Sequence, residues 1–221
     1  MEETDMKNGS WKFDDAVAAR FDEIAHTNLP NYEKVIQKCL TIARAAFPDT
    51  KSTKIIDVGS ALGRTMEVFL EAGYVQVHGV DNSEAMLAQS RIQENLILSD
   101  TFPKQSGPFD LVIANWTLHF ITDEKKRKEY IRDIRESLSE GGMLVLSEKM
   151  GSTTLVHDQY TEFKRSHGIS DQAIAENTAA VKGVLAPYPL SWYIKALEES
   201  GFKTVEAIDA EWCFNTFLCR T

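Results

Sequence analysis

The chain has 221 residues, of which 43% are hydrophobic and 26% are charged, and this composition predicts a water-soluble protein with a large core. Its formal net charge of −9 argues against broad contact with nucleic acid, which depends mainly on lysine and arginine. No apolar run approaches the roughly 18 residues of a membrane span, so we expect no membrane-bound form.

The three cysteines, Cys39, Cys213 and Cys219, are widely separated and lack the spacing of a metal site. We therefore expect reduced thiols, no bound metal and a cytoplasmic location. The only basic run, residues 125–128 (KKRK), is flanked by acids within a predicted helix. We interpret this run as a solvated helix face.

Two helices are predicted before the first strand, over residues 14–24 and 33–47. The aromatic residues Trp11 and Phe13 precede them and are expected to dock against the fold. Because both helices come before the sheet, we predict that residues 11–47 form a helical lid over its ligand crevice.

The rest of the chain has the pattern of an α/β domain. Residues 54–148 alternate between short apolar strands and amphipathic helices, which predicts a mainly parallel sheet. Two further strands, over residues 204–208 and 213–218, are expected to close it as a hairpin. Residues 150–190 do not fit this repeat, and we interpret them as a helical insertion for substrate binding within a single domain, residues 1–221. The predicted central strands cover residues 54–58, 75–81, 95–100, 109–115 and 143–146, and the predicted helices between them cover residues 83–94 and 123–138.

The turn after the first strand is the most informative stretch. Asp57 lies near the end of the strand, and Gly59 and Gly63 bracket a turn that leads into a helix. Glycine permits a left-handed backbone there and lets a ligand approach the chain, as in nucleotide-binding α/β proteins. The spacing of the two glycines matches neither the dinucleotide motif nor the phosphate loop, so alone it also fits a structural turn.

Polar residues also end three later strands, at Asp81, Asp100 and Asn115. The Asp81 carboxylate can accept hydrogen bonds from both hydroxyls of a ribose, although it could instead cap the next helix. Because the carboxyl ends of parallel strands share one edge of a sheet, these residues predict a nucleoside site at that edge.

In these features the chain resembles the class I S-adenosylmethionine-dependent methyltransferases. The resemblance implies a Rossmann-like methyltransferase fold with a seven-stranded sheet and an antiparallel C-terminal hairpin. It also implies S-adenosyl-L-methionine as the cofactor, S-adenosyl-L-homocysteine as the product and a small molecule as the substrate. The loop after the fourth strand, which contains Trp116, would lie beside the transferred group.

From residue 21 onward the chain resembles the carboxy-S-adenosylmethionine synthases more closely. The shared stretches are residues 21–22 (FD), 30–32 (PNY), 57–63 (DVGSALG), 80–83 (VDNS), 115–120 (NWTLHF), 144–149 (LVLSEK) and 163–168 (FKRSHG), and the last two are the most specific. In that family prephenate loses CO2, which the deprotonated methyl group of the sulfonium captures, and the likeness also implies a homodimer. It assigns cofactor contacts to Tyr32, Asp57, Gly59, Ser60, Ala61, Asp81, Asn82, Met86, Asp100, Thr101 and Asn115.

Two residues depart from this family's pattern. Counting back from Gly201 places Ala196 where the family has an arginine for the new carboxylate, and alanine cannot pair with an anion. His119 replaces the family's usual glutamine, and histidine can act as a base near neutral pH, although it could also be a packed loop residue. The loss at Ala196 predicts that S-adenosylmethionine binds at least as well as its carboxylated form, and that prephenate is no substrate.

These departures leave three hypotheses. We favour S-adenosylmethionine-dependent methyl transfer to a small molecule, driven by proximity and with His119 as the base. The alternative is carboxy-S-adenosylmethionine synthesis from S-adenosylmethionine and prephenate with a rearranged anion site, and the third is a non-catalytic cofactor-binding module. Candidate substrate contacts are Trp116, His157, Arg165, Tyr188, Trp192 and Lys195. Core packing would also explain Trp192, and a surface salt bridge would also explain His157 and Arg165, whereas Tyr188, between two prolines, is better placed for a pocket.

Overall fold

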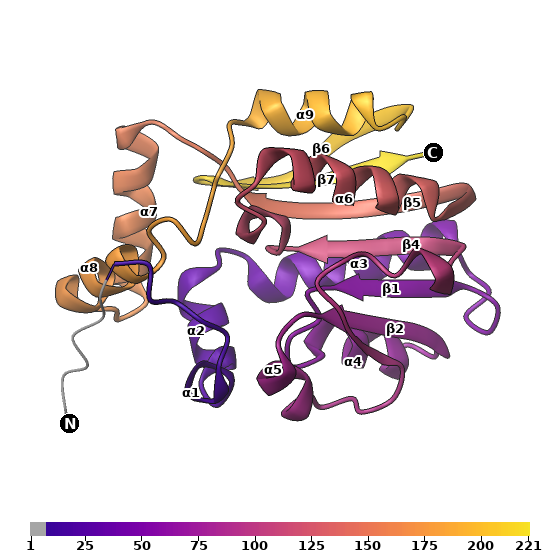
Figure 1. Ribbon diagram of the computed structural model, residues 1–221, viewed down its shortest axis with the longest axis horizontal. Coiled ribbons are helices and arrows are strands. Elements are labelled where there is room, and N and C mark those ends of the chain that lie inside the picture. The colour runs from indigo at the N-terminus through magenta and orange to yellow at the C-terminus, as the bar shows by residue number, and fades with distance from the viewer. Residues whose placement is uncertain (1–7) are drawn as a thin grey trace.

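The computed structural model describes residues 8–221, and a seven-stranded sheet lies at its centre (Figure 1). The strand order is β3-β2-β1-β4-β5-β7-β6, in which β1 to β5 run parallel and β7 is antiparallel to both of its neighbours. This confirms the predicted Rossmann-like methyltransferase fold with an antiparallel C-terminal hairpin. The strands are β1 (Lys54–Val58), β2 (Gln76–Asp81), β3 (Leu96–Leu98), β4 (Phe109–Asn115), β5 (Leu138–Lys149), β6 (Thr204–Glu211) and β7 (Phe214–Arg220).

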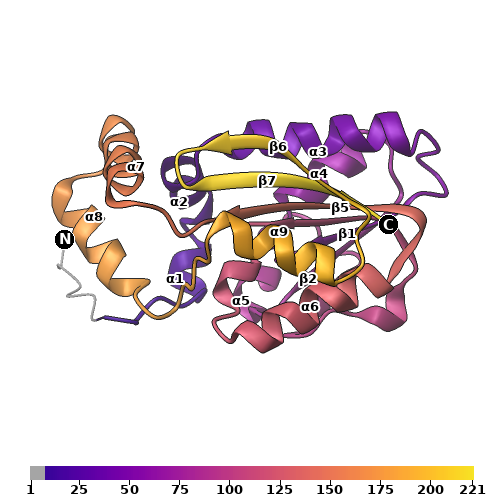
Figure 2. The ribbon, with the colours of Figure 1, turned by 90° about the horizontal axis from the view of Figure 1, so that it is seen from above.

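Helices cover both faces of the sheet (Figure 2). Helices α3 (Tyr32–Ala46) and α4 (Arg64–Glu71) lie on one face, whereas α5 (Glu84–Ala88), α6 (Glu124–Glu136) and α9 (Leu190–Glu199) lie on the other. Each face carries its own apolar cluster. Strands β1 and β4 are buried on both faces, which explains their nearly continuous apolar sequences.

The remaining helices gather beyond the carboxyl ends of the parallel strands (Figure 1). They are α1 (Asp15–Ala18), α2 (Phe21–Asn28), α7 (Thr154–Ser166) and α8 (Asp171–Ala180), and the short 3₁₀ helix η2 (Leu118–Phe120) follows β4. Gly9 and Trp11 donate backbone hydrogen bonds to the carbonyls of Ala179 and Ala180 in α8, at 3.1 and 3.2 Å. The two segments that the sequence sets apart, residues 11–47 and 150–190, therefore meet at this edge. A second 3₁₀ helix, η1 (Lys104–Ser106), lies before β4.

Two predicted helices are shorter than expected. The helix predicted over residues 14–24 is split into α1 and α2, because Arg20 has a non-helical backbone with φ −121° and ψ 8°. The helix predicted over residues 83–94 ends at Ala88, and the Gln93 side chain then donates to the Ser90 carbonyl at 2.6 Å. A local side-chain bond thus replaces the continued helix.

Strands β5 and β6 are longer than predicted. β5 starts at Leu138 and includes the glycine pair expected to separate helix and strand. β6 continues through Asp209 to Glu211, because Lys38 on α3 holds the Asp209 carboxylate at 2.5 Å and offsets its charge. The hairpin turn therefore falls at Trp212 and Cys213.

The structure describes the cysteines, the helix lengths and the groups of possible metal ligands. All three cysteines are buried free thiols. Within residues 8–221, no helix is long and apolar enough to cross a membrane. The same residues contain no group of three His, Cys, Asp or Glu side chains that could hold a metal ion.

Candidate cofactor and substrate site

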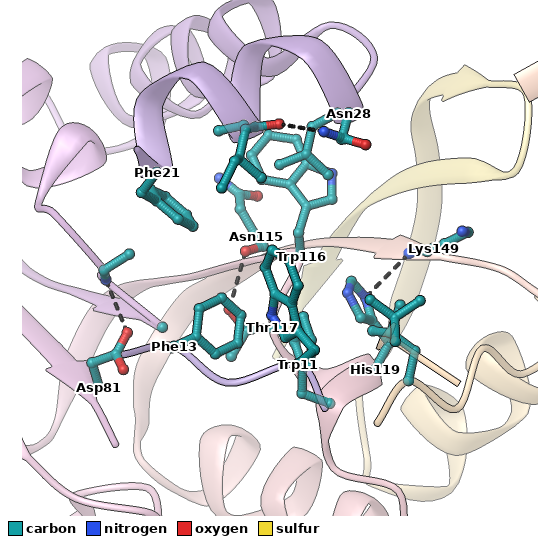
Figure 3. A pocket seen from close by; sticks show the side chains of 18 of the residues that line it. Trp11, Phe13, Phe21, Asn28, Asp81, Asn115, Trp116, Thr117, His119 and Lys149 are labelled. Atoms are coloured by element: carbon teal, nitrogen blue, oxygen red, sulfur yellow. Dashed lines mark hydrogen bonds between the residues drawn. The ribbon is translucent and has the colours of Figure 1, made fainter. Parts of the chain in front are cut away.

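A cavity of about 440 Å³ lies at the carboxyl edge of the sheet, between the strand-end loops and helices α2, α7 and α8. Figure 3 shows Asp81 towards one end of it and His119 with Lys149 towards the other. Twelve of the residues predicted from the sequence line this one cavity: Tyr32, Asp57, Gly59, Ser60, Ala61, Asp81, Asn82, Asp100, Asn115, Trp116, His119 and His157.

The loop between β1 and α4 adopts a left-handed backbone at three positions, with φ of 70° at Gly59, 45° at Ala61 and 80° at Gly63. A Cβ at Gly59 would lie only 2.1 Å from the Thr117 hydroxyl oxygen, so glycine is required there by space as well as by conformation. Both glycines thus have the left-handed backbone that the sequence predicted for this turn. The left-handed Ala61 could not be foreseen, because alanine rarely adopts this conformation.

Two carboxyl groups lie next to this loop. Asp81 accepts backbone hydrogen bonds from Ala61 and Ser83, both at 2.9 Å, so it holds the loop in place, whereas the N-cap of α5 is the Ser83 side chain, which accepts from the Met86 backbone at 3.1 Å. Burial raises the pKa of Asp81. Burial and the neighbouring charge of Asp81 raise the pKa of Asp57 to about 8, against a hydrogen bond from Thr65 that lowers it. Each Asp81 oxygen keeps a second lone pair for a ligand.

Two buried polar atoms of the cavity wall have no partner among residues 8–221. They are the Ser60 hydroxyl oxygen and the indole nitrogen of Trp11. Buried polar groups are almost always hydrogen-bonded, so both atoms indicate a polar ligand at this end of the cavity.

An aromatic wall closes the cavity from the N-terminal side. Trp11 and Phe13 lie side by side in Figure 3, with their ring centroids 5.9 Å apart. The ring centroid of Phe120 lies 4.9 Å from that of Phe13. Ser83 donates to the Phe13 carbonyl at 2.5 Å and fixes this segment beside Asp81. The sequence predicted that Trp11 and Phe13 dock, but it gave no sign that they line the ligand space.

His119 is held by a buried hydrogen-bond network. Its Nδ1 lies 2.7 Å from Glu148, and the same carboxylate accepts backbone hydrogen bonds from Leu118 and His119 at 2.7 and 2.8 Å. The Tyr193 hydroxyl donates to Glu148 at 3.2 Å, and Arg127 donates to that hydroxyl at 2.9 Å. Nε2 of His119 has no partner among the described residues. An imidazole anchored in this way can present Nε2 to the cavity as a base.

Arg127 explains why two predicted substrate contacts do not reach the cavity. It is fully buried, donates to the Ile121 carbonyl at 2.9 Å and stacks on the ring of Tyr188, with 4.5 Å to the centroid. Trp192 stacks on Tyr188. The interpretation of residues 125–128 as a solvated face is therefore wrong at Arg127, and Tyr188 and Trp192 pack around its guanidinium.

The far end of the cavity contains two lysines that sequence analysis missed. Lys149 is the last residue of β5, and Lys164 lies on α7, where its spacing from His157 and Tyr160 puts all three on one helix face. Each ammonium nitrogen packs against the Tyr160 ring, 4.6 Å from its centroid for Lys149 and 4.7 Å for Lys164. Lys149 lies in residues 144–149 and Lys164 in residues 163–168, the two stretches most typical of the synthases. This was the only feature of the sequence that could have indicated their role.

Four further predicted site residues lie outside the cavity wall. Met86 is fully buried behind it, and Thr101 is exposed beside it. Arg165 binds Glu162 and Asp171 on the outer side of α7, and Lys195 pairs with Glu199 in solvent at 3.6 Å. We therefore withdraw Arg165 and Lys195 as substrate contacts, because acids at the surface already hold them: Glu162 of α7 and Asp171 of α8 for Arg165, and Glu199 of α9 for Lys195.

Comparison with known proteins agrees with this geometry. Residues 56–146 match the family model described as a methyltransferase domain. A carboxy-S-adenosyl-L-methionine synthase from Campylobacter concisus is 31% identical, over 94% of this chain and 93% of that protein. The chain belongs to the class I S-adenosylmethionine-dependent methyltransferase family. A second synthase, from Nautilia profundicola, is 29% identical over the same shares of the two chains.

Solved structures show the same fold at low sequence identity. A putative methyltransferase of Haloferax volcanii, solved with its activator, has a TM-score of 0.65 at 13% identity and covers 95% of this chain and 97% of its own. The plantazolicin methyltransferase BpumL, solved with SAH, has a TM-score of 0.66 at 12% identity and covers 94% and 95%. The matched family model and the curated relatives, rather than these structures, show that this protein is an S-adenosylmethionine-dependent transferase.

Proposed function

We propose that this protein converts S-adenosylmethionine and prephenate into carboxy-S-adenosylmethionine. The observation that carries this proposal is the meeting of residues 144–149 and 163–168 at the cavity, where Lys149 and Lys164 line its far end. These are the two stretches that generic methyltransferases rarely share. The curated relatives over most of the chain are named for the same reaction. The proposal replaces our sequence-based preference for methyl transfer.

The near end of the cavity suits the nucleoside and amino-acid parts of S-adenosylmethionine. Asp81 would accept hydrogen bonds from the ribose hydroxyls, and the unpaired Ser60 hydroxyl and Trp11 indole nitrogen supply further polar contacts. Asp57 holds its proton up to about pH 8 in the free protein. A ligand ammonium beside it would favour the ionised form.

The chemistry requires the methyl carbon of S-adenosylmethionine to lose a proton and then to bond to CO2 released from prephenate. The electron pair left by the CO2 makes the prephenate ring aromatic and expels its hydroxyl group as hydroxide, which leaves as water once it takes up the methyl proton. His119 is the candidate base, because Glu148 fixes its Nδ1 and leaves Nε2 for the cavity. The Trp116 ring, whose centroid lies 5.2 Å from that of Tyr32, would shield the reacting group from water. Exclusion of water would keep the methyl carbanion equivalent from being reprotonated before it meets CO2.

A second candidate is methyl transfer to a small nucleophile. The observation in its favour is Ala196, which is 1% exposed within the apolar cluster beneath α9 and carries no cation. In that reaction His119 would take a proton from the acceptor.

Turnover distinguishes the two candidates. We expect purified protein with S-adenosylmethionine and prephenate to accumulate the carboxylated cofactor over many turnovers, as measured by mass spectrometry of quenched reactions. Failure to form it, with S-adenosylmethionine consumed only when a methyl acceptor is present, would favour methyl transfer.

We further propose that residues 11–47 act as a lid. Phe21, Asn28 and Tyr32 line the cavity from this segment, and the Asn28 carbonyl accepts a hydrogen bond from Tyr160 on α7 at 2.9 Å. Lids of this kind exclude water and complete a site. Hydrogen exchange over residues 20–40 should slow when S-adenosylhomocysteine binds, and unchanged exchange in the saturated complex would refute the lid.

A further inference from the structure

Lys149 and Lys164 differ from Arg64 and Arg127, the two arginines of the cavity region, because neither lysine ammonium has a hydrogen-bond acceptor or an ion-pair partner among residues 8–221. Arg64 at the near end is bound by Glu33 and Glu67, and buried Arg127 is bound by carbonyls and a hydroxyl. No hydrogen bond or ion pair joins either lysine ammonium to any of residues 8–221. Lys164 is nevertheless only 5% exposed.

The groups that surround the two ammonium nitrogens are neutral or basic. Tyr160 offers its ring face to both, and His157 and Cys213 lie near enough to influence them electrostatically. Glu148 precedes Lys149 but points to the opposite face of β5, where Leu118, His119 and Tyr193 satisfy it. Residues 8–221 therefore supply no carboxylate that pairs with these cations.

A buried ammonium without a partner is costly and is seldom retained unless something else compensates it. Both lysines line the cavity, so a ligand bound there can be that compensating group. Ala196 cannot hold an anion, and its position faces the core beneath α9 rather than the cavity.

We propose that Lys149 and Lys164 form a carboxylate-binding subsite, with the Tyr160 ring as its floor. The subsite takes the carboxylate of a small organic acid, carried either on the sulfonium of the carboxylated cofactor or on the free acid that reacts with S-adenosylmethionine. This inference rests on the proposed function, because it assigns the substrate class to the same cavity. Lys149 and Lys164 would thus provide the positive charge for the carboxylate that Ala196 cannot provide.

The test compares two ligands that share the nucleoside and homocysteine parts, of which the second carries a carboxymethyl group on a sulfonium sulfur. The lysine variants isolate the part of the affinity difference that the carboxylate causes. Calorimetry would give the dissociation constants of S-adenosylhomocysteine and of carboxy-S-adenosylmethionine for the full chain. We expect the carboxylated ligand to bind about tenfold to a hundredfold more tightly, as charge-assisted hydrogen bonds to one carboxylate imply. Lys149→Met and Lys164→Met should each remove most of this preference while the affinity for S-adenosylhomocysteine stays within about threefold. Lys195→Met, which removes an exposed lysine of α9, is the matched control and should leave the preference unchanged.

A second arm identifies the source of the carboxylate. Prephenate is titrated into the protein saturated with S-adenosylhomocysteine, which has no carboxymethyl group. Binding that both lysine variants abolish assigns the subsite to the free acid, and no binding, with the carboxylated-ligand preference intact, assigns it to the cofactor's own carboxylate.

The preference should also depend on pH. Burial and the charge of Lys149 lower the pKa of Lys164 to about 8, so its ammonium is lost as the pH rises above that value. The preference for the carboxylated ligand should therefore fall several-fold from about pH 7 to about pH 9.5 in the wild type and much less in Lys164→Met. Equal affinities of the wild type for both ligands at pH 7, with tight binding of S-adenosylhomocysteine, would overturn the subsite alone. Failure of S-adenosylhomocysteine to bind at all would instead overturn the proposed function.

Discussion

Asp81→Ala is expected to weaken S-adenosylhomocysteine binding by about 2 kcal/mol or more, which is roughly thirtyfold, in a protein that still folds. The substitution removes the proposed acceptor of the ribose hydroxyls. It also removes the anchor of the first loop, because Asp81 holds the Ala61 backbone at 2.9 Å while Ala61 is in a left-handed conformation. Isothermal titration calorimetry measures the loss, and circular dichroism checks the fold.

Asp133→Ala is the matched control for Asp81→Ala. Asp133 is a partly exposed acid on α6 that pairs with Lys104 at 2.9 Å, and it does not line the cavity. We expect its replacement to leave the dissociation constant within about twofold. If folded Asp81→Ala bound S-adenosylhomocysteine as tightly as the wild type, the nucleoside would have to lie elsewhere in the cavity.

Lys164→Met is expected to increase the free energy of unfolding of the ligand-free protein by about 2–3 kcal/mol at pH 7. The pKa of Lys164 falls from 10.5 to about 8 on folding, chiefly through burial, so the folded chain holds this charge at a cost. Methionine keeps the length of the side chain and its packing against Tyr160 without the charge. Urea unfolding of both proteins measures the difference, with the exposed Lys195→Met as the control that changes little.

The pH dependence of this difference gives an independent check. Between pH 8 and pH 10.5 the unfolded chain keeps the Lys164 proton while the folded chain releases it, so the wild type gains stability relative to the variant as the pH rises. The stabilising effect of Lys164→Met should therefore be complete below pH 8 and nearly absent above pH 10.5. A variant that is less stable than the wild type at pH 7 would mean that the ammonium is already compensated in the free protein.

The nucleoside end of the site could be predicted because it depends on local patterns. Strand β4 has the predicted bounds, and a polar residue directly after a buried parallel strand has to lie at the carboxyl edge of the sheet. Asp81, Asp100 and Asn115 were therefore expected at one edge, and all three line the same cavity. The fold followed from the same periodicity.

The far end of the site could not be predicted, because it depends on how distant segments pack. Lys149 and Lys164 meet only because α7 folds back over the end of β5, which no spacing in the sequence indicates. Arg127 looked like a solvated residue in a basic run, but its burial draws Tyr188 and Trp192 away from the cavity. The choice between the two reactions depends on Lys149 and Lys164. Without them, the missing arginine at Ala196 was the main sequence evidence, and it favoured methyl transfer.

Isotopic labelling of the turnover reaction tests the proposed function most directly. The protein is incubated with S-adenosylmethionine deuterated in its methyl group and with prephenate labelled with carbon-13 in the carboxylate that is lost. The account predicts a carboxylated cofactor that has lost one deuterium, kept the other two and gained the labelled carbon, because the methyl carbon is deprotonated and then captures CO2. An intact trideuterated methyl group on an acceptor, with no labelled carboxylate on the cofactor, would contradict it.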